Sequence, residues 1–152
     1  RVAAAVGASL IAECALIVDA GTAVTLDVIA GKAFKGGNIS PGLRLRFRSL
    51  NCFTSRLPLV NPAGALPEFG YDTETALRSG VVNGIVDEIE NTFHRGAAVY
   101  RGLRLLLTGG DADYLAPLLR KRGLQPEIVN SLVGSGLCEI YKYNMATAES
   151  SE

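Results

Sequence analysis

The 152-residue chain has no excess of either charge, because fifteen Lys and Arg residues balance fifteen Asp and Glu residues. Non-specific binding to nucleic acids or to membrane surfaces requires a basic excess. The sequence also has no secretion signal and no apolar run of the roughly 20 residues that a membrane-spanning helix needs. We therefore expect no nucleic-acid partner, no membrane partner and a cytoplasmic location.

Metal-binding and disulfide-forming residues are scarce as well. The chain has three cysteines, Cys14, Cys52 and Cys138, without a C-x-x-C pair, and a single histidine, His94. This set has neither the ligand spacing of a zinc site nor the pattern of a disulfide framework. A reducing compartment fits it best, and His94 is expected at the surface near the end of a helix.

An initiator methionine is also missing, because the chain begins at Arg1 and its one methionine is Met145. We expect the chain to be part of a longer gene product. Hydrophobic residues make up 48% of it, which is enough for the core of one domain. The expected organisation is a helix over residues 1–14 that leads in from a missing N-terminal domain, one domain over 15–144, and a disordered tail over 145–152.

The order of the expected elements predicts an α/β fold. An alanine-rich helix comes first, and three closely connected strands then form an antiparallel meander. Two helices follow, and after them strands and helices alternate. This order is typical of the ribonuclease-H-like domain of the actin-like ATPase superfamily. The expected strands cover 15–19, 22–29, 33–39, 103–108 and 127–129, and the expected helices cover 2–13, 41–52, 73–95, 111–122 and 133–143.

Local patterns add detail to this expected fold. The helix over 73–95 has an apolar stripe at a spacing of four residues, which predicts that it packs on the sheet. Its cap is expected to be Asp72 or Thr73. Pro41 is expected to begin the preceding helix, because proline suits a first helical turn. The second strand alternates apolar and polar residues, which places Asp27 on its wetter face.

The segment LIVDAGT, at the end of the first strand, predicts a binding site. An unpaired Asp19 at the end of a buried strand would cost on the order of several kcal/mol unless a cation, a basic side chain or backbone amides compensate it. Gly21 permits a positive φ and a close approach to the backbone. Thr22 adds a hydroxyl. Together they indicate a corner that binds a cation and a phosphate, and the alternative is an ordinary polar turn.

Two more glycine-rich segments follow strands. In LLLTGGDA, Gly109 and Gly110 precede a helix whose free N–H groups can receive a ligand. GGNISPG, residues 36–42, occupies another strand-to-helix connection. Its glycines either allow the chain to turn or contribute to the same ligand site. Three arginines come next and are expected on a solvated helix face: Arg44, Arg46 and Arg48.

These motifs together resemble those of the type III pantothenate kinases, also described as the Bvg accessory factor family. VDAGTAVTLDV, GGNISPGL, Leu57-Pro58, TETALRSGVVNG, LTGGDA and GLCEIYKYN follow the family's order and spacing over residues 1–144. D-A-G-T-A followed by G-G-x-I-x-P-G is specific, whereas T-G-G-D-A is shared with other sugar-kinase-like proteins. The resemblance implies ATP-dependent phosphorylation of pantothenate to 4′-phosphopantothenate, the first step of coenzyme A biosynthesis.

The resemblance also implies roles for individual residues. Asp19 corresponds to the ligand of a monovalent cation, potassium or ammonium, and magnesium is implied as a further cofactor. The family's general base is the aspartate immediately before Arg1 in a G-x-D-R motif, so no catalytic residue is expected in this chain. The implied ATP contacts are Gly21, Thr22, Gly109 and Gly110, and the implied pantothenate contacts are Arg1 and Thr73.

One part of the family pattern, the N-terminal domain with its D-x-G-N-T phosphate loop, has no counterpart in the chain. Phosphoryl transfer in this architecture needs both domains, so the chain alone is expected to be inactive. Two alternatives stay open: a non-catalytic nucleotide-binding regulatory or accessory protein of the same fold, and a sugar or acetate kinase. The family's acceptor pocket near a dimer interface favours a homodimer, and Gly80 and Gly84 would allow close helix packing there or within the domain.

Overall fold

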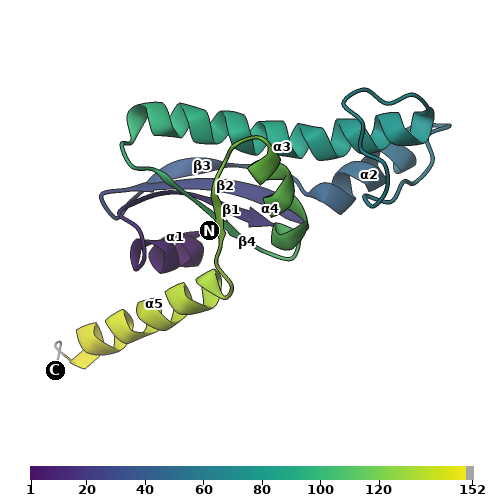
Figure 1. The fold of residues 1–152 in the computed structure, drawn as a ribbon. Helices are drawn as coiled ribbons and strands as arrows, with labels where there is room; N and C mark the ends of the chain where they lie inside the picture. The colour runs from purple at the N-terminus through teal and green to yellow at the C-terminus, as the bar shows by residue number, and fades with distance from the viewer. Residues whose placement is uncertain (150–152) are drawn as a thin grey trace.

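The computed structural model describes residues 1–149 and has a five-stranded sheet with helices on both faces (Figure 1). The strands are β1 (Cys14–Ala20), β2 (Ala23–Ala30), β3 (Ala33–Pro41), β4 (Arg104–Thr108) and β5 (Pro126–Ile128), and the helices are α1 (Val2–Ser9), α2 (Leu43–Cys52), α3 (Thr73–Val99), α4 (Ala112–Lys121) and α5 (Leu132–Glu149). The strand order is β3-β2-β1-β4-β5. β1, β2 and β3 pair antiparallel, as predicted, and β4 pairs parallel with both β1 and β5.

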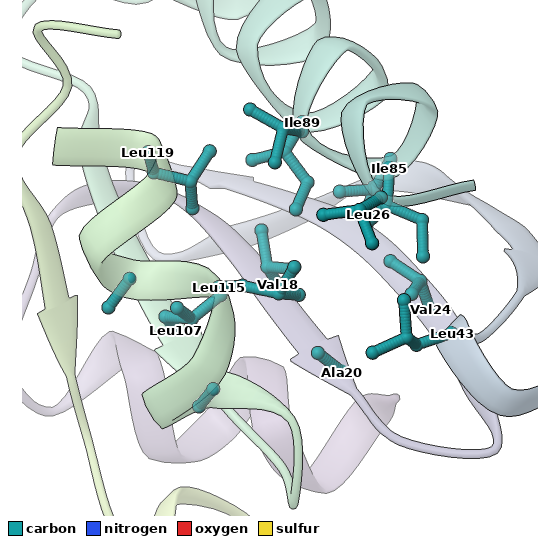
Figure 2. Close-up of a cluster of buried hydrophobic side chains, with 14 of the residues drawn as sticks. Val18, Ala20, Val24, Leu26, Leu43, Ile85, Ile89, Leu107, Leu115 and Leu119 are labelled. Carbon is teal, nitrogen blue, oxygen red and sulfur yellow. The ribbon is translucent and has the colours of Figure 1, made fainter. Parts of the chain in front are cut away.

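One face of the sheet packs against α2, α3 and α4. The apolar stripe predicted for the long helix is confirmed, because Val81, Ile85 and Ile89 are buried. Truncating a fully buried leucine or isoleucine typically costs about 2–5 kcal/mol, so this layer fixes the positions of the strands. Figure 2 shows its buried side chains, among them Val18, Ala20, Val24, Leu26, Leu43, Ile85, Ile89, Leu107, Leu115 and Leu119.

The opposite face of the sheet is covered by α1, and α5 packs on α1 (Figure 1). These two helices pack backbone to backbone through glycines. A Cβ added to Gly7 would lie 2.2 Å from the carbonyl oxygen of Leu132, and one added to Gly136 would lie 1.8 Å from the carbonyl oxygen of Ala3. The segment expected as a lead-in helix therefore packs as a layer of the domain.

The helix boundaries differ from the predicted ones at several points. Pro41 does not begin α2 but is the last residue of β3, an edge strand, where a residue without an N–H group is tolerated. Gly42 takes the N-cap position of α2. α1 ends at Ser9, earlier than predicted, and α3 continues to Val99, beyond its predicted end.

The last helix, α5, also continues further than predicted and reaches Glu149. The Thr147 hydroxyl donates to the carbonyl oxygens of Tyr143 at 3.0 Å and Asn144 at 2.9 Å, within the helix. Residues 145–149 are therefore helical, although the sequence predicts a disordered tail, and residues 150–152 lie outside the described residues.

No helix within residues 1–149 combines the length and the apolar character that crossing a bilayer would take.

Candidate functional site

Two of the predicted motifs meet where β1 and β4 end. Parallel strands end at the same edge of a sheet, and Asp19 is the direct neighbour of Thr108 across this pair. The loop after β4 is joined to the last residue of β1 by a hydrogen bond, in which the backbone N–H of Asp111 donates to the carbonyl oxygen of Ala20 at 2.9 Å. The D-A-G-T and T-G-G segments are therefore neighbours in space.

Gly109 makes the close contact between these two strand ends. Its φ of 92° lies in the left-handed region, where a side chain is strained. A Cβ at this position would lie 2.4 Å from the carbonyl oxygen of Ala20 and 2.6 Å from Oδ1 of Asp19. The Asp19 carboxylate thus lies directly against the backbone of Gly109, which leaves room for glycine alone.

Asp19 is half-buried, and no lysine or arginine among residues 1–149 forms an ion pair with it. A basic partner, one of the predicted ways to compensate the carboxylate, is therefore not found in the described part of the chain. That part also has no group of three or more His, Cys, Asp or Glu side chains that could hold a metal ion. A single carboxylate beside backbone carbonyls fits a singly charged cation that takes its other oxygen ligands from the backbone, from water or from a bound phosphate.

A cavity of about 330 Å³, which we call the strand-end cavity, opens at the loops that follow β1 and β4. A Cβ at Gly21 or at Gly110 would meet no atom within 4 Å, so a ligand can reach the backbone at both glycines. Three of the four predicted nucleotide contacts thus line one cavity, and Gly109 lies against Asp19 next to it. The lining residues are Gly21, Thr22, Arg44, Leu45, Arg48, Gly110 and Asp111.

The prediction for the backbone of Gly21 was wrong, because its φ is not positive. The close approach in this region depends instead on Gly42, where a Cβ would lie 1.9 Å from the carbonyl oxygen of Gly21. The Gly42 N–H also donates to the carbonyl oxygen of Thr22 at 2.9 Å. The last glycine of GGNISPG therefore serves to dock the start of α2 on the Gly21–Thr22 turn.

Arg44 and Arg48 line the strand-end cavity, a role that the sequence did not predict. Both are exposed and neither has a carboxylate partner within residues 1–149, whereas Arg46 between them pairs with Glu88. Two like charges four residues apart on a helix repel each other, and Arg44, in the first turn of α2, is also repelled by the positive end of the helix dipole. A bound anion would offset this repulsion. The signal in the sequence was their spacing, one helical turn apart, directly after GGNISPG.

Arg1 and Thr73, the predicted pantothenate contacts, lie on opposite faces of the sheet. Arg1 pairs with Asp27, on the face that α1 covers, whereas Thr73 begins α3 on the other face. Thr73 lines a separate cavity of about 610 Å³, together with apolar residues that include Leu50 and Leu57. Within one chain, the two residues therefore do not form a common pocket.

The position of Thr73 is fixed by the cap of α3. Asp72 is the N-cap residue, and its Oδ1 accepts from the Thr75 backbone N–H at 2.7 Å. The hydrogen bonds that Thr75 donates, from its backbone and from its hydroxyl, hold the pKa of Asp72 below its ordinary value. Thr73 is thus the first residue of a well-capped helix, and its side chain is exposed, so that a ligand can reach it.

Asp27 is buried, with 0% exposure, although the alternation of β2 predicts a wetter environment. The side chain of Arg1 reaches it, with Nε 2.9 Å and Nη2 2.6 Å from Oδ1. The pKa of Arg1 is raised, chiefly by this hydrogen bond. Sequence reasoning missed the pair because its members are 26 residues apart and meet only when α1 packs on the sheet.

Comparison with known proteins identifies the family of the chain. The family model for type III pantothenate kinase matches residues 1–95. A type III pantothenate kinase from Porphyromonas gingivalis is 44% identical over 151 residues, which cover 95% of this chain and 61% of the relative. Another from Azobacteroides pseudotrichonymphae is 42% identical over 146 residues, covering 94% and 58%. The chain thus spans less than two thirds of the length of these relatives.

Solved structures give the fold. A Campylobacter jejuni protein, described as a candidate transcriptional activator of the Baf family, superposes with a TM-score of 0.68 at 28% identity, covering 93% of this chain and 63% of that one. The Alp12 filament structure, at 14% identity, superposes with a TM-score of 0.59 and covers 93% and 53%. Alp12 has the actin-like ATPase fold, so the predicted fold class is confirmed.

Proposed function

The chain belongs to the type III pantothenate kinase family, and from this premise we propose that it is the C-terminal part of an ATP-dependent pantothenate kinase. The product is 4′-phosphopantothenate, in the first step of coenzyme A biosynthesis. One observation carries the proposal: the open backbone of Gly21 and Gly110 adjoins Asp19, a carboxylate that no basic side chain of residues 1–149 neutralises. Open backbone N–H groups can bind the phosphates of a nucleotide, and an unneutralised carboxylate can bind a cation.

The proposed roles are those that the family resemblance implies, and the geometry of the strand ends is compatible with them. Gly21 and Thr22 contact the phosphates of ATP, and the backbone at Gly109 and Gly110 borders the nucleotide. Asp19 would hold a monovalent cation, potassium or ammonium, and magnesium is the other proposed cofactor. Bound there, these ions would spread the negative charge that develops on the transferred phosphoryl group. The proposed general base is the aspartate that precedes the arginine of the family's G-x-D-R motif, which corresponds to Arg1.

We propose further that the protein is a homodimer. Arg1 and Thr73 lie on opposite faces of one subunit, so a shared acceptor pocket would combine one of them with the other from a second subunit. The outer side of α3 supports this assembly. A Cβ at Gly80 would meet no atom within 4 Å, and one at Gly84 would lie 3.7 Å from Nη1 of Arg46. These two glycines are thus not required for packing within the domain.

The proposed location is the cytoplasm, where ATP is available and thiols stay reduced. Cys14, Cys52 and Cys138 are free thiols. The alternative function, a non-catalytic regulatory or accessory protein, has less support. The curated relatives bear the name of a kinase, and a net charge of zero gives no basic excess for binding DNA.

Turnover of pantothenate tests the proposed function. The full-length protein is expected to release ADP when it is given ATP, magnesium, potassium and pantothenate, as a coupled assay would report. The 152-residue chain alone is expected to be inactive, because the phosphate-binding loop of the other domain is needed to position ATP. A full-length protein without pantothenate-dependent turnover would refute the function, and a chain that alone matches its rate would refute the need for the second domain.

The arginines of the strand-end cavity give a second expected result. Arg44→Gln and Arg48→Gln are each expected to weaken ADP binding by about 10- to 150-fold, since a charge-assisted hydrogen bond contributes about 1.5–3 kcal/mol. Adenosine binding should change much less, and isothermal titration calorimetry can measure both. Arg101→Gln is the matched control, because Arg101 is exposed and precedes β4 at the other end of that strand. Equal losses for ADP and adenosine would contradict a role in phosphate binding.

A further inference from the structure

We propose that Asp27 is a positioning residue, which orients the guanidinium of Arg1 toward the carboxylate of the acceptor. The proposal rests on the proposed function, in which Arg1 contacts pantothenate. Asp27 acts through Arg1 and does not touch the substrate, because its own side chain has no exposed surface.

The contacts of Arg1 leave one side of its guanidinium free. Nε donates to Oδ1 and Oδ2 of Asp27 at 2.9 and 3.2 Å, and Nη2 donates to Oδ1 at 2.6 Å. Nη1 has no hydrogen-bond partner among residues 1–149, and the Arg1 side chain is 35% exposed. The carboxylate therefore holds one edge of the guanidinium, and the remaining donors are available to a ligand.

Two residues of β3 hold this pair in place. The Phe34 ring covers the guanidinium, with its centroid 5.6 Å from Cζ of Arg1, at the distance of a cation–π contact. A Cβ at Gly37 would lie 2.2 Å from Oδ1 of Asp27, so a glycine is required where the carboxylate is buried. With an edge and a face both fixed, the guanidinium has little freedom to turn.

A guanidinium held in one orientation contributes more to the binding of an anionic ligand than to the stability of the fold. A buried ion pair contributes little to stability compared with apolar residues of similar volume. Its value lies in orientation, because a guanidinium binds a planar carboxylate through two parallel hydrogen bonds and loses less entropy when it is already oriented. Pantothenate has one carboxylate, which is the chemical group that a pre-oriented Arg1 would recognise.

Steady-state kinetics of the full-length protein can separate positioning from a purely structural role. Asp27→Asn is expected to raise KM for pantothenate by about tenfold or more, while KM for ATP changes by less than about twofold. In a protein that already carries Arg1→Gln, adding Asp27→Asn should raise KM for pantothenate by less than about twofold, because the effect passes through Arg1. If Asp27 mattered for folding alone, Asp27→Asn would change KM for pantothenate and KM for ATP alike, and would do so in the wild-type protein and in the Arg1→Gln protein.

Two further variants complete the experiment. Phe34→Leu loosens Arg1 without disturbing the core, because Phe34 is 46% exposed, and it should give a smaller rise in KM for pantothenate alone. Glu127→Gln is the matched control. It removes a carboxylate from another arginine pair, in which Nε of Arg104 donates to Oε1 at 2.8 Å, and this pair is exposed. Neither KM is expected to change in that variant.

The possible outcomes distinguish this proposal from the proposed function. A wild-type protein that binds no pantothenate would refute the function itself. If the wild-type protein binds pantothenate but Asp27→Asn leaves its KM unchanged, or acts fully in the Arg1→Gln background, the positioning role is refuted. If Asp27→Asn does not fold, Phe34→Leu decides the question, and an unchanged KM for pantothenate in that variant overturns the proposal.

Discussion

Gly109→Ala is expected to lower the free energy of unfolding by about 2–6 kcal/mol and to abolish phosphoryl transfer, because two costs combine at this position. A φ of 92° strains any residue with a side chain. The added methyl would also lie 2.4 Å from the carbonyl oxygen of Ala20 and 2.6 Å from Oδ1 of Asp19, so one strand end must move. Urea unfolding followed by circular dichroism measures the loss of stability, and ADP release by the full-length protein measures the loss of activity.

Gly110→Ala is the matched control for this substitution. A Cβ at Gly110 meets no atom within 4 Å, and its φ is not positive, so the variant should be as stable as the wild type to within about 1 kcal/mol. Its methyl group enters the strand-end cavity and should weaken ATP binding. If the Gly109 and Gly110 variants were equally stable, the contact between the ends of β1 and β4 would not contribute to the stability of the fold as proposed.

Asp19→Asn is expected to reduce kcat of the full-length protein by about 10²–10³-fold, which is the usual effect of removing one group that stabilises charge in a transition state. Stability should stay the same or rise slightly. Asp19 has no basic partner among residues 1–149, so neutralising it breaks no ion pair of the described structure. A loss of activity without a loss of stability would identify a residue kept for its function.

The control for Asp19→Asn is Asp113→Asn. Asp113 is an exposed aspartate in the first turn of α4, close in sequence to the strand-end cavity but not part of its lining. Its loss should cost about 0.3–1 kcal/mol of stability through the helix dipole and leave kcat unchanged. The assignment of Asp19 would be wrong if Asp19→Asn kept more than about a tenth of the wild-type kcat.

The features that the sequence predicted correctly depend on neighbouring residues. The spacing of Val81, Ile85 and Ile89 is sufficient to identify the buried face of a helix, whatever the helix packs against. Likewise, Asp19 lies near the end of β1 and Gly109 directly follows β4, and pairing of the two strands in parallel brings them together. Local patterns, together with one topological rule, were enough to predict that these two residues lie together.

The features that the sequence missed depend on contacts between distant segments. Asp27 occupies a polar position in an alternating strand, and it is buried because Arg1 reaches it from α1. Arg44 and Arg48 have the pattern of a solvated helix face, and they line the strand-end cavity because Gly42 docks α2 on the Gly21–Thr22 turn. Neither result follows from propensity or periodicity, since both patterns are equally common on ordinary surfaces.

The most direct test of the site is the potassium dependence of ATP binding, measured by calorimetry on the full-length protein and on its Asp19→Asn variant. If Asp19 holds a cation against the phosphates, replacing choline with potassium should tighten ATP binding to the wild-type protein by about tenfold or more, and should have no effect on the variant. An ATP affinity that is the same in choline and in potassium, or a potassium effect that persists without the carboxylate, would contradict the assignment.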